Sequence, residues 1–175
     1  DGLAETFYEN SQLRSKVNRI VGIPHGQVEE YYDNGQLKSK VTFKNGDQDG
    51  LGITYYQNGN LSSNWVYKDG RQDGRVESYY ENGQKSGFIT WRDGIQDGPI
   101  EDYYENGKLK SKGFFKDGKQ DGLGEIYNDN GDLIGQWNTK DGVPHGSWTT
   151  YSENGQLEEK GCYNDGEEVA PSQCP

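Results

Sequence analysis

The sequence has no long apolar run and few hydrophobic side chains of any kind. Hydrophobic residues account for 29% of its 175 residues, and the formal net charge is −11. No stretch approaches the roughly 20 apolar residues that a transmembrane helix requires. Such a composition is typical of disordered chains unless aromatic rings supply the missing buried area. The 13 tyrosines and 4 tryptophans can do so, and a conventional globular core is therefore not expected.

Residue types that carry catalysis or bind metals are also scarce. The sequence contains two histidines and two cysteines. His25 and His145 lie far apart in the chain, each between a proline and a glycine. No nucleophile, base and orienting group can be assembled from this inventory. The sequence thus predicts a protein that is not an enzyme and has no catalytic residue, no metal site and no cofactor.

The excess of acidic residues limits the classes of partner. Phosphate groups attract fields of Lys and Arg, so nucleic acid and direct membrane binding are not expected. A basic protein surface would suit this charge, although acidity also simply keeps a protein soluble. The charge balance favours another protein as the partner, and it leaves both explanations open.

Glycine, in contrast, is abundant and recurs every 24 residues in three series. The series are Gly2, Gly26, Gly50, Gly74, Gly98, Gly122 and Gly146; Gly35, Gly59, Gly83, Gly107, Gly131 and Gly155; and Gly22, Gly46, Gly70, Gly94, Gly118, Gly142 and Gly166. No insertion breaks the phase. The pattern predicts seven stacked copies of one unit over residues 1–166, followed by a C-terminal tail, residues 167–175.

Residues 26–49 show the unit most clearly. Alternating segments at 27–32 and 37–44 are followed by Asn34-Gly35 and Asn45-Gly46. Asn-Gly between such segments predicts a two-residue type I′ turn with both residues at positive φ. We therefore expect an all-β fold, a single elongated antiparallel β-meander solenoid of seven 24-residue β-hairpin repeats with about 14 strands.

The register follows from a two-residue turn at Asn34-Gly35. This turn places Tyr32 opposite Leu37 and Val28 opposite Val41. The equivalents of the valine pair are Ala4/Val17, Gly52/Trp65, Val76/Ile89, Ile100/Gly113, Gly124/Trp137 and Trp148/Gly161. Wherever one partner is Trp, the other is Gly, so the combined volume of each pair stays roughly constant. A slip of one residue would destroy this relation.

The register defines two faces of the sheet. The first face carries the valine pair, Leu37, Tyr32 and their equivalents, and we expect it to be the core. The second face carries Tyr31 and its equivalents, together with opposed charges such as Glu29 and Lys40. Opposed charges favour the register by a few tenths of a kcal/mol per pair.

Two sets of polar residues fall at turns. His25 and His145 occupy the place that Asp has in other copies of the motif. Asp-Gly-x-Gln-Asp-Gly recurs in repeats three to five, where stacked carboxylates could hold Ca²⁺. Asp before Gly is also ordinary turn chemistry, and we favour that interpretation.

The two cysteines, Cys162 and Cys174, lie in the last repeat and the tail. We expect a disulfide that ties the tail back, because an exposed solenoid end benefits from a covalent staple. A disulfide requires an oxidising compartment, which favours an extracytoplasmic location. Unpaired thiols in a cytosolic protein are the alternative. The sequence contains no methionine, so we expect the chain to begin after a removed signal or lipid anchor.

The unit Gly-x-x-x-x-Tyr-Tyr-x-Asn-Gly-x-Leu, closed by Phe/Tyr-x-Asp-Gly-x-x-Asp, resembles the MORN repeat. The bacterial variant found in antitoxin components of toxin–antitoxin systems is the most similar form. The resemblance covers residues 1 to about 166 and implies protein interaction, sometimes lipid binding, with no catalytic motif. Three positions depart from the pattern: Lys85 replaces the leucine, and Asn128 and Ser152 replace the second tyrosine. These departures predict less regular packing toward the C-terminus.

The second face breaks its own polar pattern in repeats three to six. Apolar residues replace polar ones at Ile53, Val66, Phe88, Phe114 and Ile134, beside Tyr55, Tyr79 and Tyr103. Clustered apolar and aromatic residues are the usual anchors of protein interfaces. We predict that these eight residues bind a partner protein. The alternative is that the sheet curls and buries this side as a second core layer.

Together these patterns predict a non-enzymatic protein-binding repeat module. The resemblance implies an antitoxin or immunity protein that binds and neutralises a secreted toxin or effector. It would act in the bacterial periplasm or envelope. The alternative is a cell-envelope or surface scaffold that binds lipid or wall components.

Overall fold

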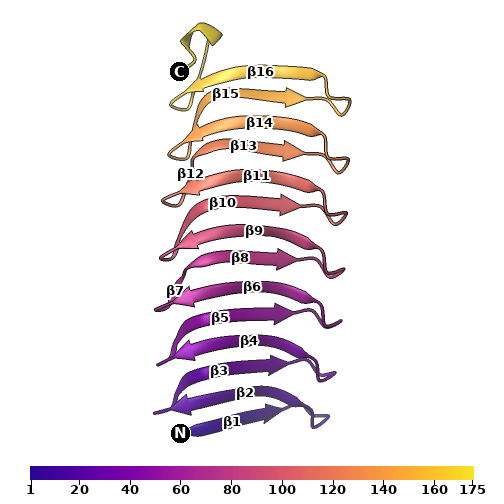
Figure 1. The fold of residues 1–175 in the computed structure, drawn as a ribbon, viewed down its shortest axis with the longest axis vertical. Coiled ribbons are helices and arrows are strands. Elements are labelled where there is room, and N and C mark those ends of the chain that lie inside the picture. The colour runs from indigo at the N-terminus through magenta and orange to yellow at the C-terminus, as the bar shows by residue number, and fades with distance from the viewer. The chain divides into compact units, whose positions relative to one another are not determined.

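The computed structural model describes all 175 residues. The chain forms one open antiparallel sheet of 17 strands, in which hairpins follow one another in chain order (Figure 1). It divides into two compact units, residues 1–85 with 91–94 and residues 86–90 with 95–175. The predicted all-β meander of hairpin repeats is confirmed.

Strands of the first unit and the strand that the two units share run from residue 2 to residue 92. They are β1 (Gly2–Phe7), β2 (Leu13–Ile20), β3 (Ile23–Tyr31), β4 (Leu37–Lys44), β5 (Asp47–Tyr55), β6 (Leu61–Lys68), β7 (Arg71–Gln72), β8 (Gly74–Tyr79) and β9 (Lys85–Arg92). Strands of the second unit are β10 (Ile95–Tyr103), β11 (Leu109–Lys116), β12 (Lys119–Gln120), β13 (Gly122–Tyr127), β14 (Leu133–Lys140), β15 (Val143–Tyr151), β16 (Leu157–Asn164) and β17 (Glu167–Val169), followed by the 3-10 helix η1 (Pro171–Gln173).

The centre of each hairpin has the register expected from the glycine and tryptophan pattern. Val28 pairs with Val41 between β3 and β4, and Gly52 pairs with Trp65 between β5 and β6. The Trp65 indole lies directly over Gly52, where a Cβ atom would stand 2.3 Å from Cε2. The aromatic ring therefore packs against backbone that carries no side chain. Such packing supplies buried apolar area that the few aliphatic residues could not provide.

The turn that connects one hairpin repeat to the next is of the predicted two-residue kind, with both residues at positive φ. Asn45 and Gly46 both have positive φ, 53° and 95°, and Lys44 pairs with Asp47. In the following repeats an Asp replaces this Asn with the same conformation, as Asp69 shows with a φ of 49°. Short polar side chains tolerate the left-handed region, which explains the Asn and Asp preference.

The turn inside each repeat is different from the prediction. The ladder ends at Tyr31, which pairs with Leu37, and the register shifts there by a β-bulge. The Tyr32 carbonyl accepts from the N–H of Gly35, and the Tyr32 N–H donates to Gln36. Only Gly35 has positive φ in this loop. The loop is thus a three-residue connection with a glycine bulge, not a type I′ turn.

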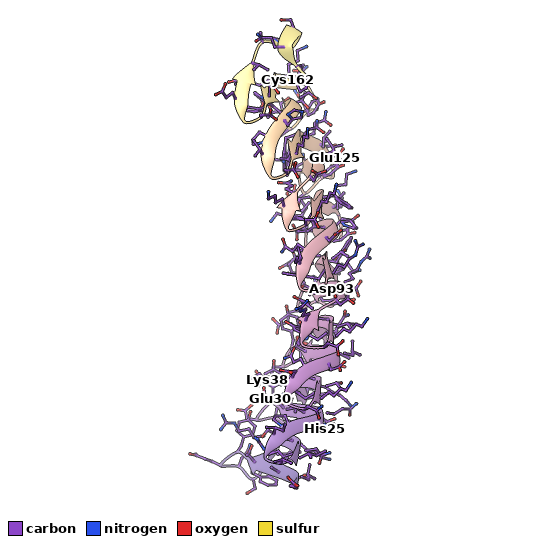
Figure 2. All side chains as sticks on the ribbon, turned by 90° about the vertical axis from the view of Figure 1, so that its left-hand side faces the viewer. His25, Glu30, Lys38, Asp93, Glu125 and Cys162 are labelled. Carbon is purple, nitrogen blue, oxygen red and sulfur yellow. A yellow bond between two sulfur atoms is a disulfide. The ribbon has the colours of Figure 1, made fainter.

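The three-residue loop, together with a separate β-bulge at Lys38, corrects two face assignments. Tyr32 does not stand opposite Leu37, and Leu37 lies on the second face with Tyr31. Lys38, the extra residue of the bulge, lies on the first face and pairs with Glu30 at 3.5 Å (Figure 2). The first face therefore does not carry the leucine series that was expected in its core.

A second bulge occurs at the first glycine of most repeats. Gly50 adopts a φ of 113°, and the register between β4 and β5 shifts between Val41 and Phe43. In two repeats this bulge divides the strand, which separates β7 from β8 and β12 from β13. These divisions and the extra strand β17 account for 17 strands where about 14 were expected.

The sheet is a single layer whose side chains project from both faces (Figure 2). Phe88 and Cys162 are its buried hydrophobic residues, and most other core positions are half-buried. Stability must then come largely from contacts between neighbouring hairpins, as expected for a repeat protein.

Tyrosine hydroxyls join several neighbouring repeats. The second tyrosine of the Tyr-Tyr pair donates to the backbone carbonyl of the first tyrosine in the following repeat. Tyr32 donates to Tyr55 at 2.8 Å, and Tyr56 donates to Tyr79 at 2.7 Å. Asparagines in the loops add a parallel bond, such as the one from the Asn58 amide to the Glu81 carbonyl at 2.9 Å.

The C-terminal tail is attached by the predicted disulfide. Cys162 and Cys174 are bonded, with 5.7 Å between their Cα atoms, and Cys162 is 2% exposed. Within the tail, Glu167–Val169 forms β17 along β16, where Val169 pairs with Cys162. The bond fixes the segment that follows β17 against the last hairpin.

Candidate partner-binding face

A ladder of charges runs along the centre of the second face. In the first unit Lys16 lies between Glu5 and Glu29, and Glu29 lies between Lys16 and Lys40. Lys40 and Glu29 form an ion pair at 3.2 Å. In the second unit Lys112 stands between Glu101 and Glu125, and it is ion-paired with Glu125. The middle of this face is therefore largely neutralised by its own cross-strand pairs.

Tyrosine hydroxyls of the second face donate to these glutamates. Tyr31 donates to Glu29 at 2.7 Å, and Tyr127 donates to Glu125 at 2.7 Å. The bond from Tyr31, followed by contact with Lys40, lowers the pKa of Glu29. The same bond and partial burial raise the pKa of Tyr31. These hydrogen bonds therefore hold the tyrosine side chains of this row in fixed positions on the second face.

The lysine that departs from the leucine pattern strengthens this network. Lys85 occupies the leucine slot of repeat four, and its ammonium donates to Glu77 at 2.6 Å. Asn64 and Tyr79 also donate to the Glu77 carboxylate. The hydrogen bond from Lys85 is the largest cause that lowers the pKa of Glu77, and the bonds from Asn64 and Tyr79 lower it further. Partial burial acts in the opposite direction, and the resulting pKa is about 2. The position of Lys85 also shows that the leucine slot faces the tyrosine row.

Four of the predicted partner-binding residues lie on the second face with different degrees of exposure. Val66 and Phe114 are exposed on the second face, at 39% and 42% of their surface. Ile53 is half-buried in the central row, where it pairs with Lys40 and Asn64. Phe88 is only 7% exposed and offers little area to a partner.

The three tyrosines of the prediction are half-buried on the second face. Tyr79 and Tyr103 bond to the glutamates two residues before them in the chain, Glu77 and Glu101. Tyr55 has Ile53 at that position, so its strand presents an apolar side chain where the others present a carboxylate. All three tyrosines therefore keep part of their surface exposed.

Ile134 lies on the opposite face from the other predicted residues. It occupies the bulge position that Lys38 has in repeat two, and Lys38 contacts Glu30 on the first face. The equivalent of Glu30 in repeat six is Ile126, so an apolar pair replaces the ion pair. The sequence prediction missed this because a two-residue turn would have kept the alternation through residue 134.

In repeats three, five and six, three exposed apolar residues along one margin of the second face escaped the prediction. Leu51 pairs with Val66, and Pro99 pairs with Phe114, along the margin near the inter-repeat turns. Leu123 lies at the equivalent margin position of β13 and is 45% exposed. The sequence contained a signal for these residues, because apolar side chains replace the polar pair Gln27 and Thr42 that repeat two has at the equivalent positions. We call these five residues the apolar margin, of which Leu51 and Val66 belong to the first unit and Pro99, Phe114 and Leu123 belong to the second.

The histidines have a structural place, as the sequence indicated. His25 accepts through Nδ1 from the N–H of Asn45 at 3.4 Å, and Asp121 accepts in the same way from the N–H of Asp141 at 3.1 Å. His145 contacts Asp165 at 3.1 Å. Each therefore caps the turn of the following repeat. No group of three or more His, Cys, Asp or Glu side chains is arranged to hold a metal ion.

None of the helical structure could cross a bilayer, since no helix has the necessary length and apolar character.

Comparisons with known proteins identify the repeat. One solved structure, a protein of unknown function from Bacteroides fragilis, is 15% identical over 92% of this chain and 90% of its own, with a TM-score of 0.14 that supports no argument. No curated protein matches the chain. The model of the MORN repeat variant matches residues 1–20, 24–45, 48–69, 72–87, 96–117 and 144–165. The chain belongs to the family of MORN repeat variants.

Proposed function

We propose that this protein binds another protein through the apolar margin and tyrosine row of its second face. Membership of the MORN repeat variants supports this proposal, because MORN repeats suggest a repeat-based binding module. The observation that carries the proposal is the exposed apolar margin on an otherwise charge-paired face. A partner can cover apolar side chains there without burying an unpaired charge.

The chemistry of the face defines the partner. Apolar residues at the margin would supply the anchors, and the half-buried tyrosines beside them would add aromatic contact area. The net charge of −11 would accelerate association with a basic surface. The partner is thus a protein whose contact surface combines exposed apolar side chains with Lys or Arg.

Within this class, we propose an antitoxin or immunity protein that neutralises a secreted toxin or effector. The family resemblance supports this function, as does the acidic charge. The disulfide between Cys162 and Cys174 is compatible with an oxidising, extracytoplasmic compartment. The proposed site of action is the periplasm or the envelope.

The product of the neighbouring gene is the candidate partner to test. Phe114→Asp and Leu123→Asp each place a charge on the apolar margin, and each should weaken binding at least tenfold in calorimetry. Ile126→Asp is the matched control, because Ile126 is 37% exposed on the first face of the same strand as Leu123. Phe88 is unsuitable for this test, since a buried aspartate would unfold the protein.

Unchanged affinity in both margin variants would refute the proposed surface. Equal loss in Ile126→Asp would show that stability, not contact, explains the effect. Strong flotation with anionic liposomes and no affinity for any protein partner would instead favour a scaffold of the cell envelope.

A further inference from the structure

The hydroxyl bonds between repeats supply a template for one position that lacks its tyrosine. Four of these bonds have the same form. They are Tyr8 to Tyr31 at 2.6 Å, Tyr32 to Tyr55 at 2.8 Å, Tyr56 to Tyr79 at 2.7 Å and Tyr104 to Tyr127 at 2.7 Å. In each case a phenol ring spans two neighbouring loops, and its hydroxyl reaches a backbone carbonyl. The carbonyl that should receive the next hydroxyl is that of Tyr151.

Repeat six has Asn128 at this position, and its side chain does not reach across. The Asn128 amide donates to Asp132 at 3.2 Å, while its oxygen accepts from the N–H groups of Asn130 and Asp132. All three bonds lie within one loop. The loop bond between repeats is missing here as well, because Asn106 donates to Asp129 but Asn130 makes no equivalent bond.

A hollow of about 550 Å³ opens between the loops of repeats six and seven. Tyr127, Gly131, Asp132 and Leu133 bound it on one side, and Tyr151 and Gly155 bound it on the other. These residues flank Asn128 and include the acceptor Tyr151. The hollow therefore lies between the loop that carries Asn128 and Tyr151, whose carbonyl a tyrosine at position 128 would be expected to reach.

We infer that this hollow is a socket for a tyrosine side chain of a partner protein. The ring would pack against Leu133 and the two glycines, and its hydroxyl would donate to the Tyr151 carbonyl. Asp129, Asp132 and Glu153 make the surroundings acidic, so the incoming tyrosine would be flanked by Lys or Arg. The identity of the partner as a protein rests on the proposed function, whereas the affinity of the socket for a phenol does not.

The socket can be tested with p-cresol, which is the tyrosine side chain without its backbone. In amide-resolved NMR of the intact chain, millimolar p-cresol should shift the signals of Gly131, Tyr151 and Gly155 saturably. Toluene, which lacks the hydroxyl, should bind at least threefold more weakly. Absence of saturable shifts at these three amides would overturn the inference, whatever the outcome of the partner assay.

Two variants locate the binding site. Asn128→Tyr supplies the missing ring from the chain itself, so p-cresol shifts should disappear and the thermal midpoint should rise. Asn128→Ala leaves the hollow open, so p-cresol binding should persist. Retained binding in folded Asn128→Tyr, or loss in folded Asn128→Ala, would place the phenol elsewhere and refute the socket.

Discussion

At the scale of single residues, the sheet depends on matching large rings with absent side chains. Trp137 lies over Gly124, and Trp148 lies over Gly161, in the same way as Trp65 lies over Gly52. The sequence pattern alone was sufficient to predict these pairs, because volume must be conserved across a directly opposed pair. It could not predict that Phe88 would be buried while Phe114 is exposed, since exposure depends on neighbours that the pattern does not specify.

Gly52→Ala tests this matching directly. The new methyl group would stand 2.3 Å from Trp65 Cε2, so the indole must leave its place. Urea denaturation should show a loss of about 1–3 kcal/mol, the usual cost of overpacking. Gly113→Ala is the control, because its nearest neighbours would lie at ordinary contact distances of 3.5 and 3.6 Å. Equal losses in both variants would contradict the proposed role of the ring.

Glu77 should make stability depend on pH in a definite window. Its folded pKa of about 2 lies below its ordinary value of 4.5, so its contribution is present above pH 4.5 and is lost as the pH falls toward 2. Lys85 is about one-third exposed, so we expect only about 1 kcal/mol after screening by solvent. Glu77→Gln should be less stable than the wild type at pH 6 and equally stable near pH 2. Glu158→Gln, which removes an exposed carboxylate, is the comparison variant. If the stability difference between Glu77→Gln and the wild type were the same at pH 6 and near pH 2, the expectation would be wrong.

At the scale of the hairpin, the turn between repeats was predicted correctly and the loop inside each repeat was not. Asn-Gly fits both a type I′ turn and a three-residue loop that ends in a glycine bulge, so the dipeptide alone does not choose. The bulge is favoured because it lets adjacent tyrosines serve two purposes: Tyr31 bonds Glu29 on the second face, and Tyr32 reaches the next repeat. Lys85 in the leucine slot was the clue in the sequence, because it pairs with Glu77 on the neighbouring strand of the second face.

Tyr56→Phe tests the joint between hairpins. Removal of the hydroxyl leaves the Tyr79 carbonyl without its donor and should cost about 1 kcal/mol in urea denaturation. Tyr67→Phe serves as the comparison, since no hydrogen bond joins the Tyr67 hydroxyl to a following repeat. If the two variants lost equal stability, the hydroxyl bonds would not be what joins the repeats.

At the scale of the whole molecule, periodicity was the strongest predictor. The seven repeats, the central register, the turns between repeats and the disulfide could all be anticipated from residue spacing. The surface was anticipated only in part. The bulge placed Ile134 on the other face, and the prediction did not use the replacement of polar Gln27 by Leu51 and Leu123 at the equivalent positions. The sequence predicted irregular packing near Asn128. It could not predict the hollow itself, because the hollow depends on the Asn128 side chain bonding to Asp132 within its own loop.

The hydroxyl bonds between repeats end on backbone carbonyls, and this choice has an evolutionary consequence. A carbonyl is present whatever side chain its residue carries, so the joint makes no demand on the sequence of the neighbour. Unequal recombination could therefore duplicate, remove or exchange whole 24-residue modules without breaking the connection. Selection would remain free to rewrite the exposed positions of each module as its target diversified.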